Sequence, residues 1–417
     1  MTATITPATE TISEIARTSA QLTGKRVAMV MYSSYPEDER PRRVIDAFRK
    51  EGMTIELICL GEGNAKSQEN TEGLEILHVP LRHRRGGKLA YAFQYGSFLL
   101  ISTLVLAWRS LLRRYDLVYV HNMPDVLVIS ALVPKALGAK VILDLHDPMP
   151  ELMTTIFGLN KESRTVRFIR WMEKWSIARV DLAITVNQAC KHLFTSRSCA
   201  TDKMIVVMNT PDSVIFPFHD VTEQPSPDPF SNKRFVMMYH GTAVERNGLD
   251  IAVEALALAK DKMPDAELRV YGPSTPFLES VMCTVREKHL EGLVHYLGPK
   301  TLEELVNEIE QCDLGLVPNR RSSFTEINTP VRIFDFMALG KPVIVPLTPG
   351  IRDYFAEDSL LFFEAGNAAD LARQMEHTFS NRQKLNEIVR KGQQVYLAHT
   401  WAQEKQTLLE GVSSLLR

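Results

Sequence analysis

The sequence of 417 residues has few cysteines and no excess of either charge. Its five cysteines are scattered without a CxxC pair, which argues against a disulfide framework or a structural zinc site and is typical of a reducing compartment. Lys and Arg number 48 against 50 Asp and Glu, so a dedicated nucleic-acid binder with a basic surplus is excluded. With 45% hydrophobic and 24% charged residues, a disordered chain, a collagen-like fibre and a multi-span membrane protein are excluded as well.

Residues 1–24 lack the apolar core of an export signal. The segment is rich in Thr, Ser and Ala, and it contains Glu10 and Glu14. We therefore expect a mobile tail and a cytoplasmic protein.

What the chain does contain is an alternation of apolar strands and amphipathic helices. In residues 25–210, strands are predicted at Arg26–Tyr32, Thr54–Leu60, Leu117–His121, Val141–Leu145, Leu182–Val186 and Met204–Met208, with a helix at Arg42–Glu51. Nearly continuous apolar strands separated by helices are typical of a parallel sheet covered on both faces. The pattern predicts one doubly wound α/β domain.

Residues 211–233 contain five prolines and no helical period, which predicts a linker. The alternation restarts and predicts a second α/β domain over 234–397, followed by a helix at 398–417 that packs back on the first domain. Strands are expected at Phe235–Tyr239, Glu267–Tyr271, Val294–Leu297, Leu314–Val317, Pro342–Pro346 and Leu360–Phe363, and helices at Gly248–Met263, Leu278–His289, Leu302–Gln311 and Pro330–Leu339. Ligands of parallel sheets bind beyond the carboxyl ends of the strands, so the default site is a cleft between the two domains.

A helix start with anion-binding character is predicted at 329–332. Thr329 is a favourable N-cap and Pro330 a favourable first residue, while Gly340 ends the helix. The free N–H groups of the first turn, with Val331 and Arg332 beside them, and the helix dipole favour an anion such as a diphosphate.

Asp335 lies three residues after Arg332, on the same face of the predicted helix. A cation beside phosphates with a carboxylate just behind fits a nucleotide, because a carboxylate can accept hydrogen bonds from both ribose hydroxyls. The alternative is a capped helix with a surface ion pair.

A second loop follows the strand predicted at Phe235–Tyr239. Gly241 and Thr242 offer close approach to the backbone, and Arg246 stands just before a helix, where it could neutralise a phosphate. Taken alone, a strand, a loop and one arginine are weak evidence for a phosphate-binding site.

A third polar segment runs from Asp144 to Glu151 at the end of an apolar strand. It holds His146 and three carboxylates within eight residues, which indicates a polar site rather than packing. Metal ligation by His146 with Asp144 or Asp147 is an alternative that lacks the expected second cluster, so no metal is predicted.

In their order and spacing, these segments and the run His121-Asn122-Met123-Pro124-Asp125 resemble the retaining glycosyltransferases of family 4. The resemblance covers essentially the whole chain from Arg26 to Trp401. It implies the α/β GT-B fold, in which two Rossmann-like doubly wound domains face a central cleft. The segments at 121–125 and 146–151 resemble the acceptor side of bacterial polysaccharide-type members, and those at 239–250 and 329–343 resemble the donor side.

The resemblance further implies a hexosyltransferase-type reaction. A sugar would move from a UDP- or GDP-linked donor to a lipid-linked saccharide acceptor with retention of configuration, in polysaccharide synthesis and without a metal or other cofactor. It places the transferred sugar near His146, the diphosphate on Arg246 and Arg332, and the ribose on Asp335. The leaving diphosphate would be stabilised by the two cations and the helix dipole.

The expected site residues follow from these motifs. His146, Arg246 and Arg332 are the predicted catalytic residues. The predicted donor-binding residues are Gly241, Thr242, Arg246, Thr329, Pro330, Val331, Arg332 and Asp335. The acceptor is expected beside Asp38, Arg40, His121, Asp125, Asp147 and Glu151.

Two other functions stay open at this point. Many relatives carry two glutamates on this helix, where this chain has Ile327 and Asp335, with Glu326 one place earlier. A non-catalytic GT-B scaffold subunit is therefore one alternative, and a sugar-nucleotide epimerase is another.

Between Arg82 and Tyr115 the sequence has no Asp or Glu. An apolar stretch over 89–112, about 36 Å long as a helix, has basic flanks and several internal polar residues that argue against a membrane span. We expect this helix to lie on the anionic inner face of the cell membrane; the alternative is a core helix with solvated basic ends. The predicted membrane contacts are Arg82, Arg84, Arg85, Lys88, Phe98 and Trp108.

A second stripe of aromatic residues at helical spacing, Phe168, Trp171 and Trp175, is predicted to be core.

Overall fold

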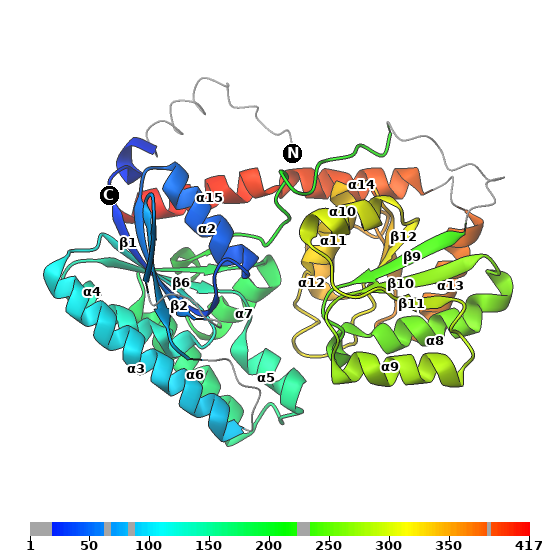
Figure 1. The fold of residues 1–417 in the computed structure, drawn as a ribbon, viewed down its shortest axis with the longest axis horizontal. Coiled ribbons are helices and arrows are strands. Elements are labelled where there is room, and N and C mark those ends of the chain that lie inside the picture. Colours follow the sequence, from blue (N-terminus) through cyan, green and yellow to red (C-terminus); the bar gives the residue numbers. More distant parts are fainter. Residues whose placement is uncertain (1–18, 62–67, 82–87, 223–233, 382–384) are drawn as a thin grey trace. The chain divides into compact units, whose positions relative to one another are not determined.

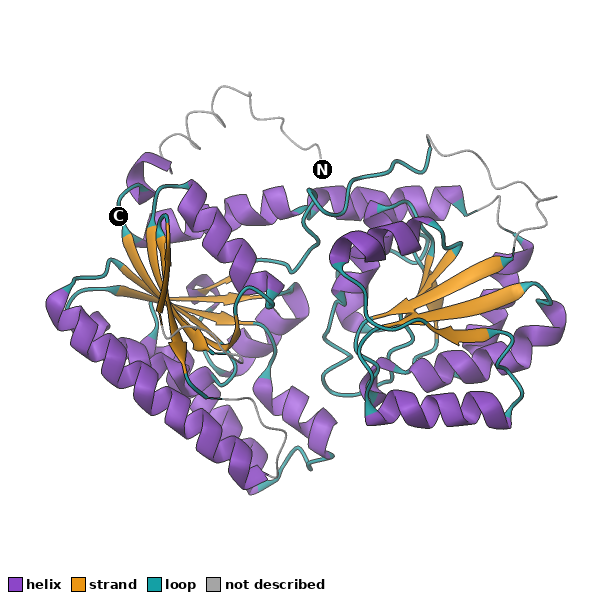
Figure 2. Cartoon of the chain, viewed as in Figure 1, coloured by secondary structure: helices purple, strands orange, loops and turns teal. Residues whose placement is uncertain are grey.

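The computed structural model describes residues 19–61, 68–81, 88–222, 234–381 and 385–417. The chain forms two compact α/β units, which are described separately (Figure 1). The first unit takes in the chain up to Thr154, Leu159–Met208 and Glu404–Arg417, and the second takes in Thr155–Gly158 and Asn209–Gln403. In each unit, helices lie on both sides of a sheet (Figure 2).

The first unit is built on an eight-stranded sheet. Its strands are β1 (Arg26–Ser34), β2 (Thr54–Leu60), β3 (Gln68–Thr71), β4 (Leu74–Val79), β5 (Leu117–His121), β6 (Lys140–Leu145), β7 (Leu182–Thr185) and β8 (Met204–Val206). Their order is β3-β4-β2-β1-β5-β6-β7-β8, parallel throughout apart from the antiparallel pair β3–β4. Every residue of β5 and β7 is buried, because a parallel sheet covered on both faces has no solvent side.

The helices of this unit surround the sheet. They are α2 (Glu39–Lys50), α3 (Lys88–Leu112), α4 (Leu132–Ala136), α5 (Met149–Phe157), α6 (Arg164–Arg179), α7 (Gln188–Arg197) and α15 (Trp401–Leu415), with the 3-10 helices η1 (Asp125–Ala131) and η2 (Thr201–Lys203). Helices α3, α4 and α6 all pack against η1. They therefore form one layer of the unit.

Helix α3 corrects part of the membrane prediction. Phe98 is fully buried and its ring meets that of Tyr32, with centroids 5.2 Å apart, so it is not a membrane contact. Trp108 is 65% exposed. Arg82, Arg84 and Arg85 lie outside the described residues, and so does the side chain of Lys88. By length and composition Phe93–Leu112 could cross a membrane.

The second unit contains a six-stranded parallel sheet in the order β11-β10-β9-β12-β13-β14. Its strands are β9 (Phe235–His240), β10 (Ala266–Tyr271), β11 (Val294–Tyr296), β12 (Leu314–Leu316), β13 (Val343–Pro346) and β14 (Leu361–Phe363). Its helices are α8 (Leu249–Ala259), α9 (Pro276–Glu287), α10 (Leu302–Glu310), α11 (Val331–Ala338), α12 (Pro349–Arg352), α13 (Ala368–Ser380) and α14 (Asn386–Ala398), with the 3-10 helices η3 (Glu245–Asn247) and η4 (Lys260–Lys262). Residues of β9, β10, α8, α9 and α13 share one buried apolar core, and α11 packs against α14.

The predicted strands are confirmed to within two residues at either end, but two predicted segments differ. The tail predicted at 1–24 is anchored at its end, where Leu22 is fully buried and the amide of Gln21 donates to the carbonyl of Ser413 at 3.1 Å. Of the linker predicted at 211–233, the part up to 222 belongs to the second unit, since the N–H of His219 donates to the carbonyl of Ala338 at 2.8 Å. Residues 223–233 lie outside the described part of the chain.

Candidate functional site

In each sheet the strand order reverses direction at one point, and ligands of parallel sheets bind at such points. In the second unit the reversal lies between β9 and β12, and in the first unit it lies between β1 and β5. The loops that follow these strands carry most of the predicted site residues.

Arg332, in the first turn of α11, reaches back over the ends of β9 and β12. Its Nη1 donates to the carbonyl of His240 at 3.0 Å, and its Nη2 donates to Oδ1 of Asn319 at 2.9 Å. Its guanidinium carbon lies 5.2 Å from the centroid of the Tyr239 ring, a cation–π distance. The cation is held at the reversal point but is only partly buried.

The other predicted diphosphate residues follow β9, near Arg332 or near the Tyr239 ring that Arg332 faces. Gly241 has a φ of +106°, and a Cβ added there would lie 3.5 Å from Cδ of Arg332. Burial raises the pKa of Tyr239, and the charges of Arg332 and Arg246 oppose that rise. The hydroxyl of Tyr239 donates to the carbonyl of Thr242 at 3.3 Å. The structure therefore gathers these predicted residues around one phenol.

Asp335 lies almost one turn further along α11 and is buried, with 6% of its surface exposed. One of its carboxylate oxygens is 3.7 Å from Nε2 of His240. Burial, followed by the charge of Arg332, lowers the pKa of His240 to about 3, so this imidazole is neutral near pH 7. A cation at the helix start is thus followed by a carboxylate deeper in the unit.

Thr329 does not cap α11, so that prediction is wrong. The N-cap is Pro330, and Oγ1 of Thr329 donates to the carbonyl of Gly350 at 2.8 Å. A Cβ added to Gly350 would lie 2.6 Å from the carbonyl carbon of Ile327, so the chain before α11 is packed tightly on this turn. The first turn of α11, which includes Val331, has no side-chain cap and keeps N–H groups for a ligand.

Tyr239, His240 and Asn319 were not predicted as site residues. Tyr239 and His240 end β9, and Asn319 follows β12 with 3% of its surface exposed. A polar residue at the end of an apolar strand was the signal that identified His146, and it would also have found these residues.

In the first unit, Asp144 of β6 is the centre of a buried network. Nη2 and Nε of Arg40 donate to its two oxygens at 2.7 and 3.1 Å, and the hydroxyl of Tyr119 donates at 2.9 Å. Burial alone would raise the pKa of Asp144, but the Arg40 guanidinium, together with His146 and His121, outweighs burial and holds that pKa well below its ordinary range. Arg40 is itself buried and donates to the carbonyl of Val207 at 2.9 Å, so it is a structural partner rather than an open acceptor contact.

The rings of His121 and His146 meet at the carboxyl ends of β5 and β6. Nδ1 of His121 lies 3.0 Å from Nε2 of His146, and one oxygen of Asp144 lies 3.5 Å from both atoms. Burial, followed by the influence of His146, lowers the pKa of His121 well below its ordinary value. The backbone N–H of His146 donates to Oδ1 of Asn122 at 2.8 Å. His146 is therefore oriented from two sides while its side chain remains 21% exposed.

Two further acceptor-side predictions lie at this edge and are partly exposed. Asp38, at the start of α2, accepts a hydrogen bond from the hydroxyl of Ser33 at 2.9 Å. The backbone carbonyl of Asp147 accepts one from the amide of Asn122 at 3.0 Å.

Asp125 and Glu151 are buried deeper than predicted. Arg197 donates to both carboxylate oxygens of Glu151, at 2.7 and 2.9 Å, and also to Glu173 at 2.6 Å. Burial, followed by the charge of Glu173, raises the pKa of Asp125 to about 7. These two carboxyl groups belong to an internal polar network that joins η1, α5, α6 and α7, which corrects their assignment to an open acceptor surface.

His121, Asp144 and His146 each offer a ligand atom within 4.8 Å of the others. Both oxygens of Asp144, however, are already bound by Arg40, whose charge opposes a second cation. The arrangement fits a hydrogen-bonded network better than a metal centre.

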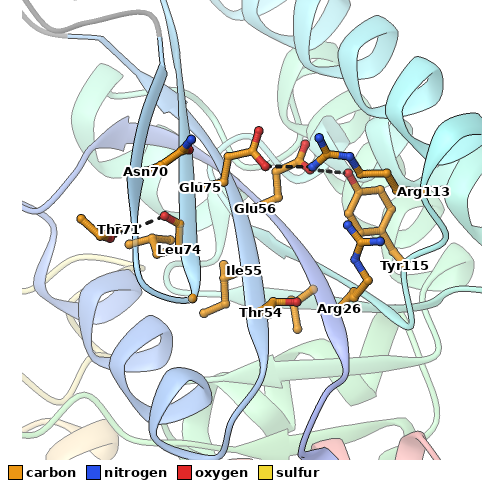
Figure 3. Close-up of a pocket in the computed structure, with 12 residues that line it drawn as sticks. Arg26, Thr54, Ile55, Glu56, Asn70, Thr71, Leu74, Glu75, Arg113 and Tyr115 are labelled. Atoms are coloured by element: carbon orange, nitrogen blue, oxygen red, sulfur yellow. Dashed lines mark hydrogen bonds and ion pairs between the residues drawn. The ribbon is translucent and has the colours of Figure 1, made fainter.

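A separate polar cavity of about 180 Å³ lies at the amino-terminal edge of the first sheet (Figure 3). It is lined by the starts of three strands, at Arg26, Thr54 and Leu74, and by Tyr115, whose hydroxyl donates to Glu56 at 2.7 Å. This cavity contains none of the predicted site residues.

Both halves of the chain match glycosyltransferase families. Residues 39–210 match the family described as "Glycosyl transferase 4-like domain", and residues 220–395 match "Glycosyl transferases group 1". The chain belongs to these glycosyltransferase families. The probable glycosyltransferase WbjE of Pseudomonas aeruginosa is 24% identical to it, over 61% of this chain and 62% of WbjE, which is less than two thirds of that relative.

Solved structures show the fold of this glycosyltransferase to be GT-B. A sucrose-phosphate synthase from Thermosynechococcus elongatus superposes with a TM-score of 0.75 at 15% identity, covering 94% of this chain and 99% of that one. Anabaena HepE, solved in complex with UDP-glucose, superposes with a TM-score of 0.67 at 16% identity, covering 93% and 99%. The predicted fold class is thereby confirmed.

Proposed function

We propose that this glycosyltransferase moves a sugar from a UDP- or GDP-linked donor to a saccharide acceptor with retention of anomeric configuration. The observation that supports the proposal is the gathering of Gly241, Arg246 and Arg332 around Tyr239, next to the uncapped first turn of α11. Two cations, a glycine and free helix N–H groups are what a diphosphate requires. The UDP-glucose complex of the structural neighbour HepE supports the same class of donor.

In this proposal each part of the donor has its own partners. The diphosphate is bound by Arg246, Arg332 and the start of α11, and the ribose by Asp335. As the bond to the sugar breaks, negative charge grows on the diphosphate, and cations already in place stabilise it without reorganisation. The transfer proceeds without a metal or other cofactor.

His146 is proposed to contact the transferred sugar. Its ring is positioned by His121 and its backbone by Asn122, so a hydrogen bond to a sugar hydroxyl would be made at little entropic cost. The acceptor is proposed to be lipid-linked and the reaction cytoplasmic, in polysaccharide synthesis. Asp38 and Asp147 are the partly exposed carboxylates available to it.

A thermal-shift panel of UDP-, GDP- and ADP-sugars tests the donor assignment. A donor at one hundred times its dissociation constant should stabilise the protein by about 2.7 kcal/mol. The donor that produces this shift identifies the nucleotide that the protein binds. No shift with any of them would contradict the proposal.

Mass balance separates the proposed function from its alternatives. Incubation of the stabilising donor with saccharide acceptors should release one free nucleoside diphosphate for each sugar transferred. An epimerase would convert the donor without releasing diphosphate, and a scaffold subunit would do neither.

A further inference from the structure

Helices α3 and α6 of the first unit present an exposed apolar face. On α3, Phe93, Leu100, Leu104 and Trp108 are between 60% and 75% exposed. Their spacing of four or seven residues puts them on one side of the helix. Patches of this kind on a soluble unit mark an interaction surface.

The opposite side of α3 is packed on its own unit. The Tyr95 ring lies 4.3 Å from that of Tyr32 between centroids, Ser102 is buried, and Arg109 is 3.1 Å from the carboxylate of Glu56. A helix that spanned a bilayer alone would lose these contacts and expose polar groups to lipid. Helix α3 therefore lies along a surface and does not cross it.

Helix α6 continues this face, contrary to its prediction as core. Phe168 and Trp171 are 56% and 57% exposed, and their rings stack with centroids 5.8 Å apart. Because α3 and α6 both pack on η1, their outer sides belong to the same layer of the unit. These two side chains, together with Phe93, Leu100, Leu104 and Trp108 of α3, are called the apolar face below.

The exposed charged side chains on α6 itself have one sign. Arg164, Arg167 and Lys174 are exposed beside the α6 aromatics. The acidic residue of α6, Glu173, is buried against Arg197, and α3 contains no acidic residue. A second copy of the chain on this face would bring like charges together, whereas anionic headgroups would complement them.

We propose that the apolar face docks on the surface of a bilayer that contains anionic lipids. The aromatic rings and leucines would enter the boundary between headgroups and acyl chains, while the bases of α6 would bind phosphate headgroups. The proposal is independent of the donor chemistry, because it requires only the first unit's surface.

Vesicle flotation with the full chain tests the proposal. Two vesicle types are compared, phosphatidylcholine alone and phosphatidylcholine mixed with phosphatidylglycerol. We expect the protein to float with the anionic vesicles and to be released by high salt, since exposed charges are screened. Equal flotation with both types, or flotation with neither, would overturn the proposal.

Matched variants locate the contact. Leu104→Ser should weaken partitioning into anionic vesicles about tenfold, because one leucine no longer enters the bilayer. Leu258→Ser is the control, since Leu258 on α8 is 57% exposed but lies in the second unit. Lys174→Glu should weaken binding about tenfold as well, and the exposed Lys288→Glu of the second unit should not.

The same variants test the alternative that a second copy of the chain covers the apolar face. If the apolar face joins two copies, light scattering will show a dimer of the parent chain that Leu104→Ser converts to monomer, without vesicle binding. That result would overturn the proposal, as would equal vesicle binding by Leu104→Ser and the parent chain. Both serine variants should melt at the parent temperature, because the replaced side chains are exposed.

Discussion

Arg332 combines a structural role with the proposed binding of diphosphate. It joins the end of β9 to the loop after β12 through its bonds to His240 and Asn319, and it is still partly exposed. An arginine suits both tasks because its fork donates in several directions at once. A lysine would keep the charge but could not make both bonds in the same geometry.

The first prediction follows from that comparison. Arg332→Ala should lower the transfer rate by at least about a hundredfold, as removal of a preorganised charge-stabilising donor does. It should also cost about 1–3 kcal/mol of stability, because the buried amide of Asn319 loses its partner. Arg332→Lys should have a transfer rate and a stability between those of the parent chain and those of Arg332→Ala.

Steady-state kinetics and urea unfolding of the same preparations measure these effects. Arg321→Ala is the control, since the side chain of Arg321 is 61% exposed and pairs with Glu326. Parent-like turnover in Arg332→Ala, with a folded protein, would remove Arg332 from the mechanism.

His240 gives the second unit a pH dependence of stability. Its pKa is about 3 in the folded chain, because it is buried near Arg332, and about 6.5 when unfolded. Between these values the unfolded chain binds the proton and the folded chain does not, so stability falls as the pH falls. At pH 5 the loss from this residue is about 2 kcal/mol relative to pH 7.

Denaturant unfolding of the parent and of His240→Gln at pH 7 and pH 5 checks this prediction. The variant should be less stable at pH 7 but should lose about 2 kcal/mol less than the parent on acidification. Identical pH slopes would show that His240 is not buried as a neutral imidazole.

At the scale of elements, the contact between the chain just before α11 and the turn at Gly350 decides where α11 begins. The carbonyl of Gly350 accepts a hydrogen bond from the hydroxyl of Thr329, and a Cβ added to Gly350 would collide with the backbone of Ile327 and Asn328. The sequence pattern of Thr329 and Pro330 predicted a capped start, but this contact takes the threonine away from the helix. Such a contact between segments distant in the chain cannot be read from a local motif.

The third prediction tests that contact. In Gly350→Ala the new Cβ would meet the carbonyl carbon of Ile327 at 2.6 Å, so one segment must move. We expect the start of α11 to shift and donor affinity to fall at least about tenfold, because anion binding depends on the placement of the first-turn N–H groups. Gly292→Ala is the control, since a Cβ there meets nothing within 4 Å. Isothermal titration with the identified donor measures the difference, and unchanged affinity in Gly350→Ala would separate this turn from the site.

The strands were predictable because apolar runs in a parallel sheet have a simple pattern, and their ends located the site. His146 and Gly241 were found this way, because each follows a predicted strand, whereas Arg332 was found from a predicted helix start. Which polar residues are exposed was not predictable, since burial of Glu151 depends on Arg197, 46 residues away. The aromatic residues of α6 show the same limit, because a stripe at helical spacing is compatible with core or surface.

At the scale of the whole molecule, the chain leaves the first unit near Asn209 and returns to it at Glu404. The carboxylate of Glu404 accepts the N–H of Met208 at 2.7 Å, and Leu408, Leu409 and Val412 are buried. The first unit is therefore completed by α15, which is separated from its other elements by the second unit. The stability of the first unit should depend on α15, even though almost two hundred residues of the second unit separate α15 from the rest of the first unit in the sequence.

The last prediction makes that dependence measurable. Leu408→Ala should cost about 2–5 kcal/mol, as truncation of a buried leucine does, because Leu408 has no exposed surface. Leu397→Ala, at a position 45% exposed on α14, should cost much less. Hydrogen exchange followed by peptide assigns the loss: amides of β7 and β8 should exchange faster in Leu408→Ala, while those of β9 and β10 should keep their protection. Uniform loosening of both sheets would show instead that the two units unfold together, and α15 would then stabilise the whole chain rather than one unit.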